Sequence, residues 1–242
     1  MANMSHEIRT PMNAIMGLSD IIMEESRGRK VFQAGRRKEK PVGGGDRAWA
    51  VHMHIPFVVY DGFFKACRTI CNLIADNYEG GRMVGDYFRR MGHRRALLVS
   101  DNDESVDRER MAGFREGFSD GQADFMKVPM NRAGRKLYYA QNMERIRSYT
   151  AAFAVSDVYA AEFMHFLLER GISVPGEISV VGFDDNALCE NCFPRLTTVG
   201  QDAENRARMA MQALKRLWDE SDGPTVEVLP VKLVIRDSVR RL

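Results

Sequence analysis

Residues 178–185 read ISVVGFDD, a mostly apolar run that ends in two aspartates. Such a run is typical of a strand that is buried on both faces, as strands of parallel sheets are. Similar runs lie at 55–60 (IPFVVY), 96–100 (ALLVS) and 151–155 (AAFAV), with helical patterns between them. This alternation predicts the α/β class, a parallel sheet with helices on both faces.

Helices are predicted at 79–91, 106–118 and 157–171, where apolar residues recur at helical spacing. Asp157 is expected to cap the third of them, because a carboxylate accepts hydrogen bonds from amides of a first turn. Ligands of parallel sheets bind beyond the carboxyl ends of the strands. Those ends carry Asp61, Ser100, Ser156 and Asp184.

Composition excludes several classes of protein. The 242 residues suffice for one large or two ordinary domains. No apolar run approaches the roughly 18 residues of a membrane span, and Glu7, Arg9 and Asp20 interrupt any signal peptide. With only four cysteines, the expected setting is the reducing cytoplasm, without a membrane partner.

The four cysteines form two closely spaced pairs, Cys67 with Cys71 and Cys189 with Cys192. A structural zinc site would require all four thiolates to converge. Because the first pair falls in a predicted helix or strand, we expect no metal site. No motif in the chain indicates a cofactor.

The charges are unevenly distributed, although the formal net charge is only +2. Residues 1–26 are acidic and form a predicted helix, in which isoleucines recur at every seventh position (Ile8, Ile15, Ile22). That spacing is typical of a helix that pairs with another helix. Residues 27–50 are strongly basic and rich in glycine, which predicts a flexible linker.

The predicted N-terminal helix places an imidazole, His6, beside the carboxylate of Glu7, a pairing that suits nucleophilic chemistry. Residues 2–15 (ANMSHEIRTPMNAI) resemble the phosphoacceptor motif, the H-box, of sensor histidine kinases. The resemblance makes His6 the phosphoacceptor, with Glu7 and Thr10 as its assisting neighbours. No Asp-x-Gly-x-Gly loop for ATP occurs in the chain, so we expect no enzyme activity. A fragment of a histidine kinase is the alternative reading.

Five further segments resemble the lactose/galactose-repressor (LacI/GalR) family in order and spacing. They are 76–81 (DNYEGG), 91–95 (MGHRR), 108–114 (RERMAGF), 174–185 (VPGEISVVGFDD) and 196–199 (LTTV). The resemblance implies a periplasmic-binding-protein-like effector domain of type I, in which two α/β lobes clamp a sugar or a nucleoside. It also implies a homodimer, and DNA contact through a helix-turn-helix domain that this chain lacks.

Seven residues are candidate ligand contacts under this resemblance: Arg110, Asp184, Asp61, Phe63, Phe64, Ser156 and Gln201. A guanidinium can bind two hydroxyls or a carboxylate at once, and a carboxylate accepts hydrogen bonds from hydroxyls. Aromatic rings stack on sugar faces. Ser156 stands where many family members have Asn. For Arg110 an ion pair with Asp107 or Glu109 on its own helix is an alternative.

The same resemblance divides the chain into one complete and one incomplete lobe. The complete lobe comprises 76–200 and 226–242, and the incomplete lobe 51–75 and 201–225. A last strand is expected near 226–235, in the complete lobe. Two strands and one helix are too few to enclose a core, so we expect exposed apolar surface on the incomplete lobe and weakened ligand binding. The predicted function is a non-enzymatic effector sensor of a LacI/GalR-type transcriptional regulator.

Overall fold

The computed structural model describes residues 56–60, 70–102, 105–219 and 225–242. The chain divides after residue 56, and the fold below is that of the second unit, Phe57–Leu242. The predicted helix at 1–26 and the predicted linker at 27–50 lie outside the described residues, as do several candidate side chains: His6, Glu7, Thr10, Asp61, Phe63 and Phe64.

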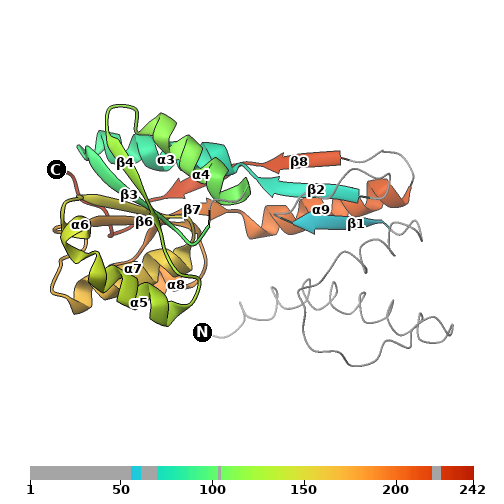
Figure 1. Cartoon of the computed structure of the whole chain (residues 1–242). Helices are drawn as coiled ribbons and strands as arrows, with labels where there is room; N and C mark the ends of the chain where they lie inside the picture. Colours follow the sequence, from blue (N-terminus) through green and yellow to red (C-terminus); the bar gives the residue numbers. More distant parts are fainter. Residues whose placement is uncertain (1–55, 61–69, 103–104, 220–224) are drawn as a thin grey trace, which may run out of the picture. The chain divides into compact units, whose positions relative to one another are not determined.

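A six-stranded sheet forms the larger part of this unit (Figure 1). In spatial order its strands are β4 (Gln122–Lys127), β3 (Arg95–Ser100), β5 (Ala151–Ala154), β6 (Ser179–Asp184), β7 (Thr197–Gln201) and β9 (Val231–Val234). All neighbours pair in parallel except β7 and β9, which are antiparallel. The parallel pairing brings the carboxyl ends of β3, β5, β6 and β7 to one edge of the sheet.

Helices cover both faces of this sheet, as the alternating pattern predicts (Figure 1). One face packs against α3 (Asn77–Arg90) and α4 (Ser105–Gly117). The other packs against α5 (Arg132–Gln141), α6 (Met143–Arg147), α7 (Asp157–Glu169) and α8 (Leu188–Asn191). Strand residues alternate between the two cores: Leu97 and Val99 of β3 belong to one, Ala96 and Leu98 to the other. The sheet is therefore buried on both faces, and the α/β class is confirmed.

Helices α3 and α4 pack backbone against backbone. A Cβ atom built on Gly81 would lie 2.0 Å from the carbonyl oxygen of Arg110, and one on Gly113 would lie 1.9 Å from that of Tyr78. No real side chain tolerates such distances, so only glycine permits this approach. The contact brings the start of α3 against the middle of α4, where Arg110 lies.

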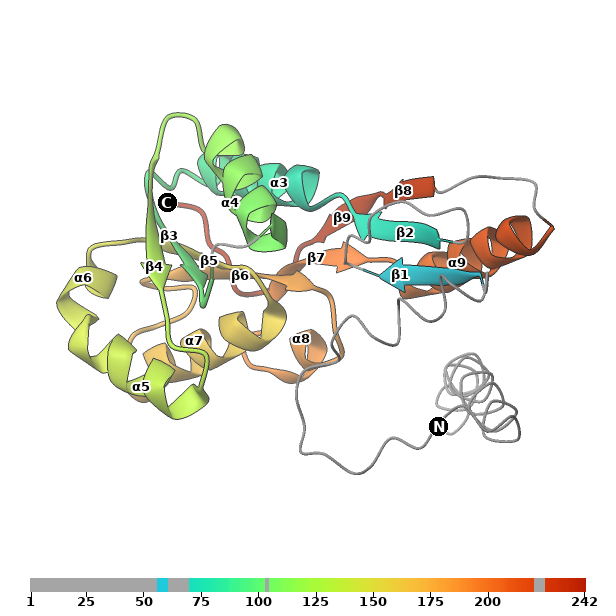
Figure 2. The ribbon, with the colours of Figure 1, turned by 45° about the vertical axis from the view of Figure 1, so that its right-hand side comes forward.

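A second, three-stranded sheet contains β1 (Phe57–Tyr60), β2 (Ile70–Ala75) and β8 (Thr225–Leu229), paired in parallel. Helix α9 (Ala203–Trp218) lies along these strands in both views (Figures 1 and 2). Its apolar side packs on Cys71, Leu73 and Leu229. Val226 and Val228 of β8 are 51% and 56% exposed.

The chain passes between the two sheets after β2, after β7 and after β8. The last passage differs from expectation: the single strand expected at 226–235 is divided at Pro230 into β8 and β9. Residues 226–229 therefore belong to the three-stranded sheet and not to the larger one. Proline lacks the amide hydrogen that a continuous strand would donate, which favours a break at this position.

A bilayer span requires a helix of about 20 mostly apolar residues, and the described helices differ from this. Within the described ranges, each of them is too short or too polar to cross a membrane.

Candidate functional site

Arg110 is the centre of a polar cluster at the carboxyl edge of the six-stranded sheet. The residue is 6% exposed, and its guanidinium lies over the Phe183 ring, 3.7 Å from the centroid. Its Nε donates to Oδ1 of Asn77 at 2.9 Å, and its Nη1 donates to the carbonyl of Val155. These contacts join the start of α3, the end of β5 and α4, and they hold the cation in one orientation.

Asp184 lies beside Arg110, at the end of β6. Its Oδ1 is 3.6 Å from Nη2 of Arg110, which makes an ion pair slightly longer than a direct hydrogen bond. Gln201, at the end of β7, donates from Nε2 to the same oxygen at 2.8 Å. Arg206 of α9 in turn donates to Oε1 of Gln201. The Asp184 side chain is 39% exposed, so solvent and solutes reach this carboxylate.

Ser156 and Asp157 follow β5, next to the carbonyl that Arg110 binds. Ser156, and not Asp157 as expected, is the N-cap of α7: its side-chain oxygen faces the amide of Tyr159 at 3.5 Å. Asp157 is fully buried and accepts hydrogen bonds from Thr198 Oγ1 at 2.5 Å and from the Asn186 amide at 2.9 Å. Burial raises the pKa of this carboxyl, while those two hydrogen bonds oppose the shift.

Of the seven predicted contact residues, the structure brings four together at this edge: Arg110, Asp184, Ser156 and Gln201. The other three lie outside the described residues. Sequence reasoning missed Asn77 and Arg206 as partners of the cluster. Asn77 belongs to the DNYEGG segment that carries the family resemblance, so a signal for it was present. Arg206 sits on an ordinary amphipathic helix, where nothing in the sequence distinguishes it.

The cysteines do not form a common cluster among the described residues. Cys71 and Cys189 are buried and Cys192 is partly buried, while Cys67 lies outside the described residues. Burial raises the pKa of the Cys189 thiol, and the neighbouring Asp157 raises it further. In the described part of the chain, no three His, Cys, Asp or Glu side chains are grouped so as to hold a metal ion.

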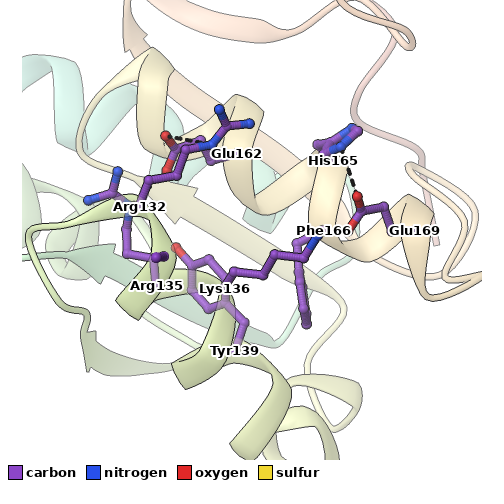
Figure 3. Close-up of a pocket in the computed structure, with 9 residues that line it drawn as sticks. Arg132, Arg135, Lys136, Tyr139, Glu162, His165, Phe166 and Glu169 are labelled. Atoms are coloured by element: carbon purple, nitrogen blue, oxygen red, sulfur yellow. Dashed lines mark hydrogen bonds and ion pairs between the residues drawn. The ribbon is translucent and has the colours of Figure 1, made fainter.

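A hollow of about 390 Å³ lies elsewhere, between α5 and α7 (Figure 3). Its charged groups are paired across the helices: Arg135 with Glu162 at 2.7 Å, and Lys136 with Glu169 at 2.7 Å. Figure 3 shows His165 next to Glu169, the two side chains being 3.1 Å apart. The hollow shares no lining residue with the Arg110 cluster.

The arrangement at the sheet edge combines a fixed cation with an accessible carboxylate. A hydroxyl can donate to a carboxylate and accept from a guanidinium, so adjacent hydroxyls of one ligand suit this pair. The fold and the cluster together are those of an α/β domain with a polar site beyond the strand ends.

Comparison with known proteins gives the family. Residues 86–239 match the model described as "Periplasmic binding protein-like domain". The chain is 27% identical over 216 residues to a probable HTH-type transcriptional repressor ExuR of Bacillus subtilis, and this match covers 81% of the chain and 62% of that protein. It is 29% identical to the HTH-type transcriptional repressor PurR of Vibrio parahaemolyticus, with 79% and 59% covered. The chain thus spans about six tenths of the length of these relatives.

Two solved structures resemble the described fold. One is a periplasmic binding protein/LacI transcriptional regulator from Alkaliphilus metalliredigens complexed with D-xylulofuranose: TM-score 0.68, 28% identity, 76% of this chain and 71% of that chain. The other, similar in fold at 24% identity, is a LacI family regulator from Enterococcus faecium with bound ribose: TM-score 0.69, 77% and 71% covered.

The chain belongs to the periplasmic binding protein-like domain family, and within it to the effector-binding domains of LacI/GalR regulators. Residues 1–39 separately match the model described as "His Kinase A (phospho-acceptor) domain".

Proposed function

We propose that the Phe57–Leu242 unit is a small-molecule sensor of a LacI/GalR-type transcriptional regulator, which binds a sugar or a nucleoside and catalyses no reaction. One observation carries the proposal. The guanidinium of Arg110 stacks on the Phe183 ring, and its Nη2 lies 3.6 Å from Oδ1 of the partly exposed Asp184. Such a pair recognises neighbouring hydroxyls. The sugars named for the two similar structures point to the same class of ligand.

Ser156 and Gln201 complete the proposed contact set, together with Asp61, Phe63 and Phe64. Gln201 is hydrogen-bonded to Asp184 at 2.8 Å, so a ligand hydroxyl that binds Asp184 competes with this amide or joins it. A Ser in place of a longer Asn leaves more room beside Val155. We therefore propose that the ligand reaches deeper at this point than an Asn would allow.

Isothermal titration of the whole chain against pentoses, hexoses and nucleosides tests the proposal. We expect one ligand of the panel to bind, and Arg110→Lys to weaken its binding about 10- to 100-fold, because a hydrogen bond to a charged group contributes about 1.5–3 kcal/mol. Arg115→Lys is the matched control, since Arg115 is an exposed arginine of the same helix. Equal affinities of the two variants would contradict the assignment of Arg110.

The measured affinity also tests whether the incomplete lobe weakens ligand binding. Among the described residues, that side holds three strands and α9, and we propose that closure over the ligand is weakened. Binding at micromolar or lower dissociation constants would contradict this part of the proposal. In the same proposal the protein is a cytoplasmic homodimer and contacts DNA only through a part other than the described residues. Light scattering coupled to size exclusion measures the oligomeric state.

A second candidate function rests on the separate match of residues 1–39. His6 would accept a phosphoryl group from ATP through an added kinase, with release of ADP, and Glu7 and Thr10 would assist. Incubation with labelled ATP and a histidine kinase catalytic domain should then give acid-labile label that His6→Gln abolishes. Absence of label in the unchanged chain would remove this candidate.

A further inference from the structure

The backbone at the end of β6 adopts positive φ angles, which residues other than glycine rarely adopt. Asp184 has a φ of 118° and Asp185 a φ of 53°. Aspartate is one of the few non-glycine residues found at φ near 50°, but a φ of 118° is rare for any residue with a side chain and persists only where its surroundings enforce it. Because Asp184 is the proposed acceptor for the ligand, whatever enforces this turn also sets the position of that carboxylate.

Arg236 is one of the groups that enforce the turn. It follows β9, and its side chain is 8% exposed. Its Nη2 lies 2.7 Å from Oδ1 of Asp185 and 2.7 Å from Oε1 of Glu190. Its Nη1 donates to the carbonyl of Leu196 at 3.0 Å. A cation that binds Asp185, α8 and the start of β7 at once leaves the Asp185 side chain little freedom.

The opposite side of the turn is held by Asp157. Its Oδ2 accepts from the amide of Asn186, the residue after the two aspartates, at 2.9 Å. Its Oδ1 accepts from Thr198 of β7. Two contacts thus hold the turn: the ion pair of Asp185 with Arg236 and the hydrogen bond from the Asn186 amide to the buried carboxylate of Asp157. Both partner side chains are distant from the turn in sequence.

We propose that Arg236 is a positioning residue of the effector site: by binding Asp185 it holds the backbone at Asp184 in its positive-φ conformation, which presents the Asp184 carboxylate beside Arg110. The ligand-binding part of this inference rests on the proposed function. The conformational part does not, because the φ of Asp184 is measurable without any ligand.

The neighbouring Arg195 supplies a matched control. It pairs with Asp237, Nε to Oδ2 at 2.7 Å, and both side chains are about half exposed. This ion pair lies next to Arg236 in the chain. Arg195 contacts Asp237 and, at 4.0 Å, the Glu190 that Arg236 also binds, and neither carboxylate belongs to the 184–186 turn. Arg195→Met therefore removes an arginine and an ion pair, while the turn keeps its contacts with Arg236 and Asp157.

The experiment measures two quantities on the whole chain and on Arg236→Met, Arg236→Lys and Arg195→Met. The first is the scalar coupling between the amide and α protons of Asp184, which reports φ by NMR. The second is the affinity for D-ribose and D-xylulose by titration calorimetry. Thermal unfolding shows which variants are folded. If Arg236→Met does not fold, two variants take its place: Arg236→Lys, and the double variant Arg236→Met/Asp185→Asn, which also removes the charge of the Asp185 side chain.

We expect Arg236→Met to shift the coupling towards the value of extended backbone. We also expect it to weaken sugar binding about 10- to 100-fold, by analogy with the loss of metal affinity when a group that orients a metal-binding side chain is removed. Arg236→Lys should recover part of both, and Arg195→Met should leave both unchanged. An unchanged coupling in Arg236→Met overturns the inference. If neither sugar binds the unchanged chain, the proposed function fails for these ligands, while the coupling still decides the role of Arg236.

Discussion

At the residue scale, the candidate site depends on side chains that are far apart in the sequence. Arg110 binds Asn77, Val155 and Asp184, which come from three different elements. The resemblance identified Arg110 and Asp184 as candidates, but their separation and their partners follow from the packing of α3 and α4 on the sheet. An ion pair of Arg110 with Asp107 or Glu109 of its own helix, the alternative, would not explain why the guanidinium contacts three other elements.

His93 is a buried titratable residue outside the site. Its Nε2 faces the carbonyl of Arg240 at 3.2 Å, so this nitrogen carries the hydrogen, and Nδ1 accepts from the Thr150 hydroxyl at 2.9 Å. Burial, together with the positive charge of Arg240, lowers its pKa from 6.5 to about 4, although the hydrogen bond to that carbonyl opposes the shift. The ring is neutral in the folded protein, and it ties the C-terminal segment to the sheet.

We expect the protein to lose stability as the pH falls from about 6.5 to about 4. In this range the unfolded state binds a proton that the folded state does not, so the free energy of unfolding increases with pH. At about 1.4 kcal/mol per pKa unit, the full loss is about 3 kcal/mol. Urea unfolding at pH 7.5 and pH 4.5 measures it. His93→Gln should show a smaller difference between the two pH values.

At the scale of elements, the α3–α4 contact positions Arg110. The two glycine-containing segments that carry the resemblance, DNYEGG and RERMAGF, meet in this contact. The sequence therefore contained the residues of the contact, but the reason for their glycines is visible only when the two helix backbones are seen to touch.

Gly81→Ala should destabilise the protein by about 1–3 kcal/mol, because the new methyl group would overlap the carbonyl of Arg110. The gain in helix propensity, about 1 kcal/mol, offsets this only in part. Thermal or urea unfolding measures the change. Arg115→Ala, an exposed change on α4, should stay within about 0.5 kcal/mol of the unchanged chain. Equal stability of Gly81→Ala and the unchanged chain would show that the helices can separate without cost.

The elements that were not predicted include β4, α5, α6 and α8. Strand β4 reads QADFMK and lies at the edge of the sheet, where only Met126 is fully buried. An edge strand needs few apolar residues, so its sequence lacks the run by which the central strands were recognised. Helix α6 has five residues, too few for a helical period to be read.

At the scale of the whole unit, the two sheets have very unequal cores. The six-stranded sheet is buried between two layers of helices, whereas α9 packs on the three-stranded sheet through a small cluster that includes Cys71 and Leu73. The expectation of two strands and one helix in the smaller part changes to three strands, because β8 joins β2. The smaller core still buries little apolar surface.

We therefore expect β2 to open more readily than β6. Hydrogen exchange followed by mass spectrometry or NMR should show the amides of Cys71 and Leu73 exchanging faster than those of Val180 and Val181. Elements with few buried apolar contacts open at lower free energy than the global core. Equal protection of the two strands would mean that both sheets unfold as one cooperative unit.

The sequence by itself determined the α/β class, the central strands and the family, because a strand buried on both faces must be apolar throughout its length. It also indicated Arg110 and Asp184 through local segments that resemble the family. The tertiary structure decided what holds them: Asn77 and Phe183 around Arg110, Arg236 and Asp157 around the turn at Asp184. The reason is physical, since a hydrogen-bond partner is set by distance in space, and the fold brings Arg236 within 2.7 Å of Asp185 across some fifty residues of chain.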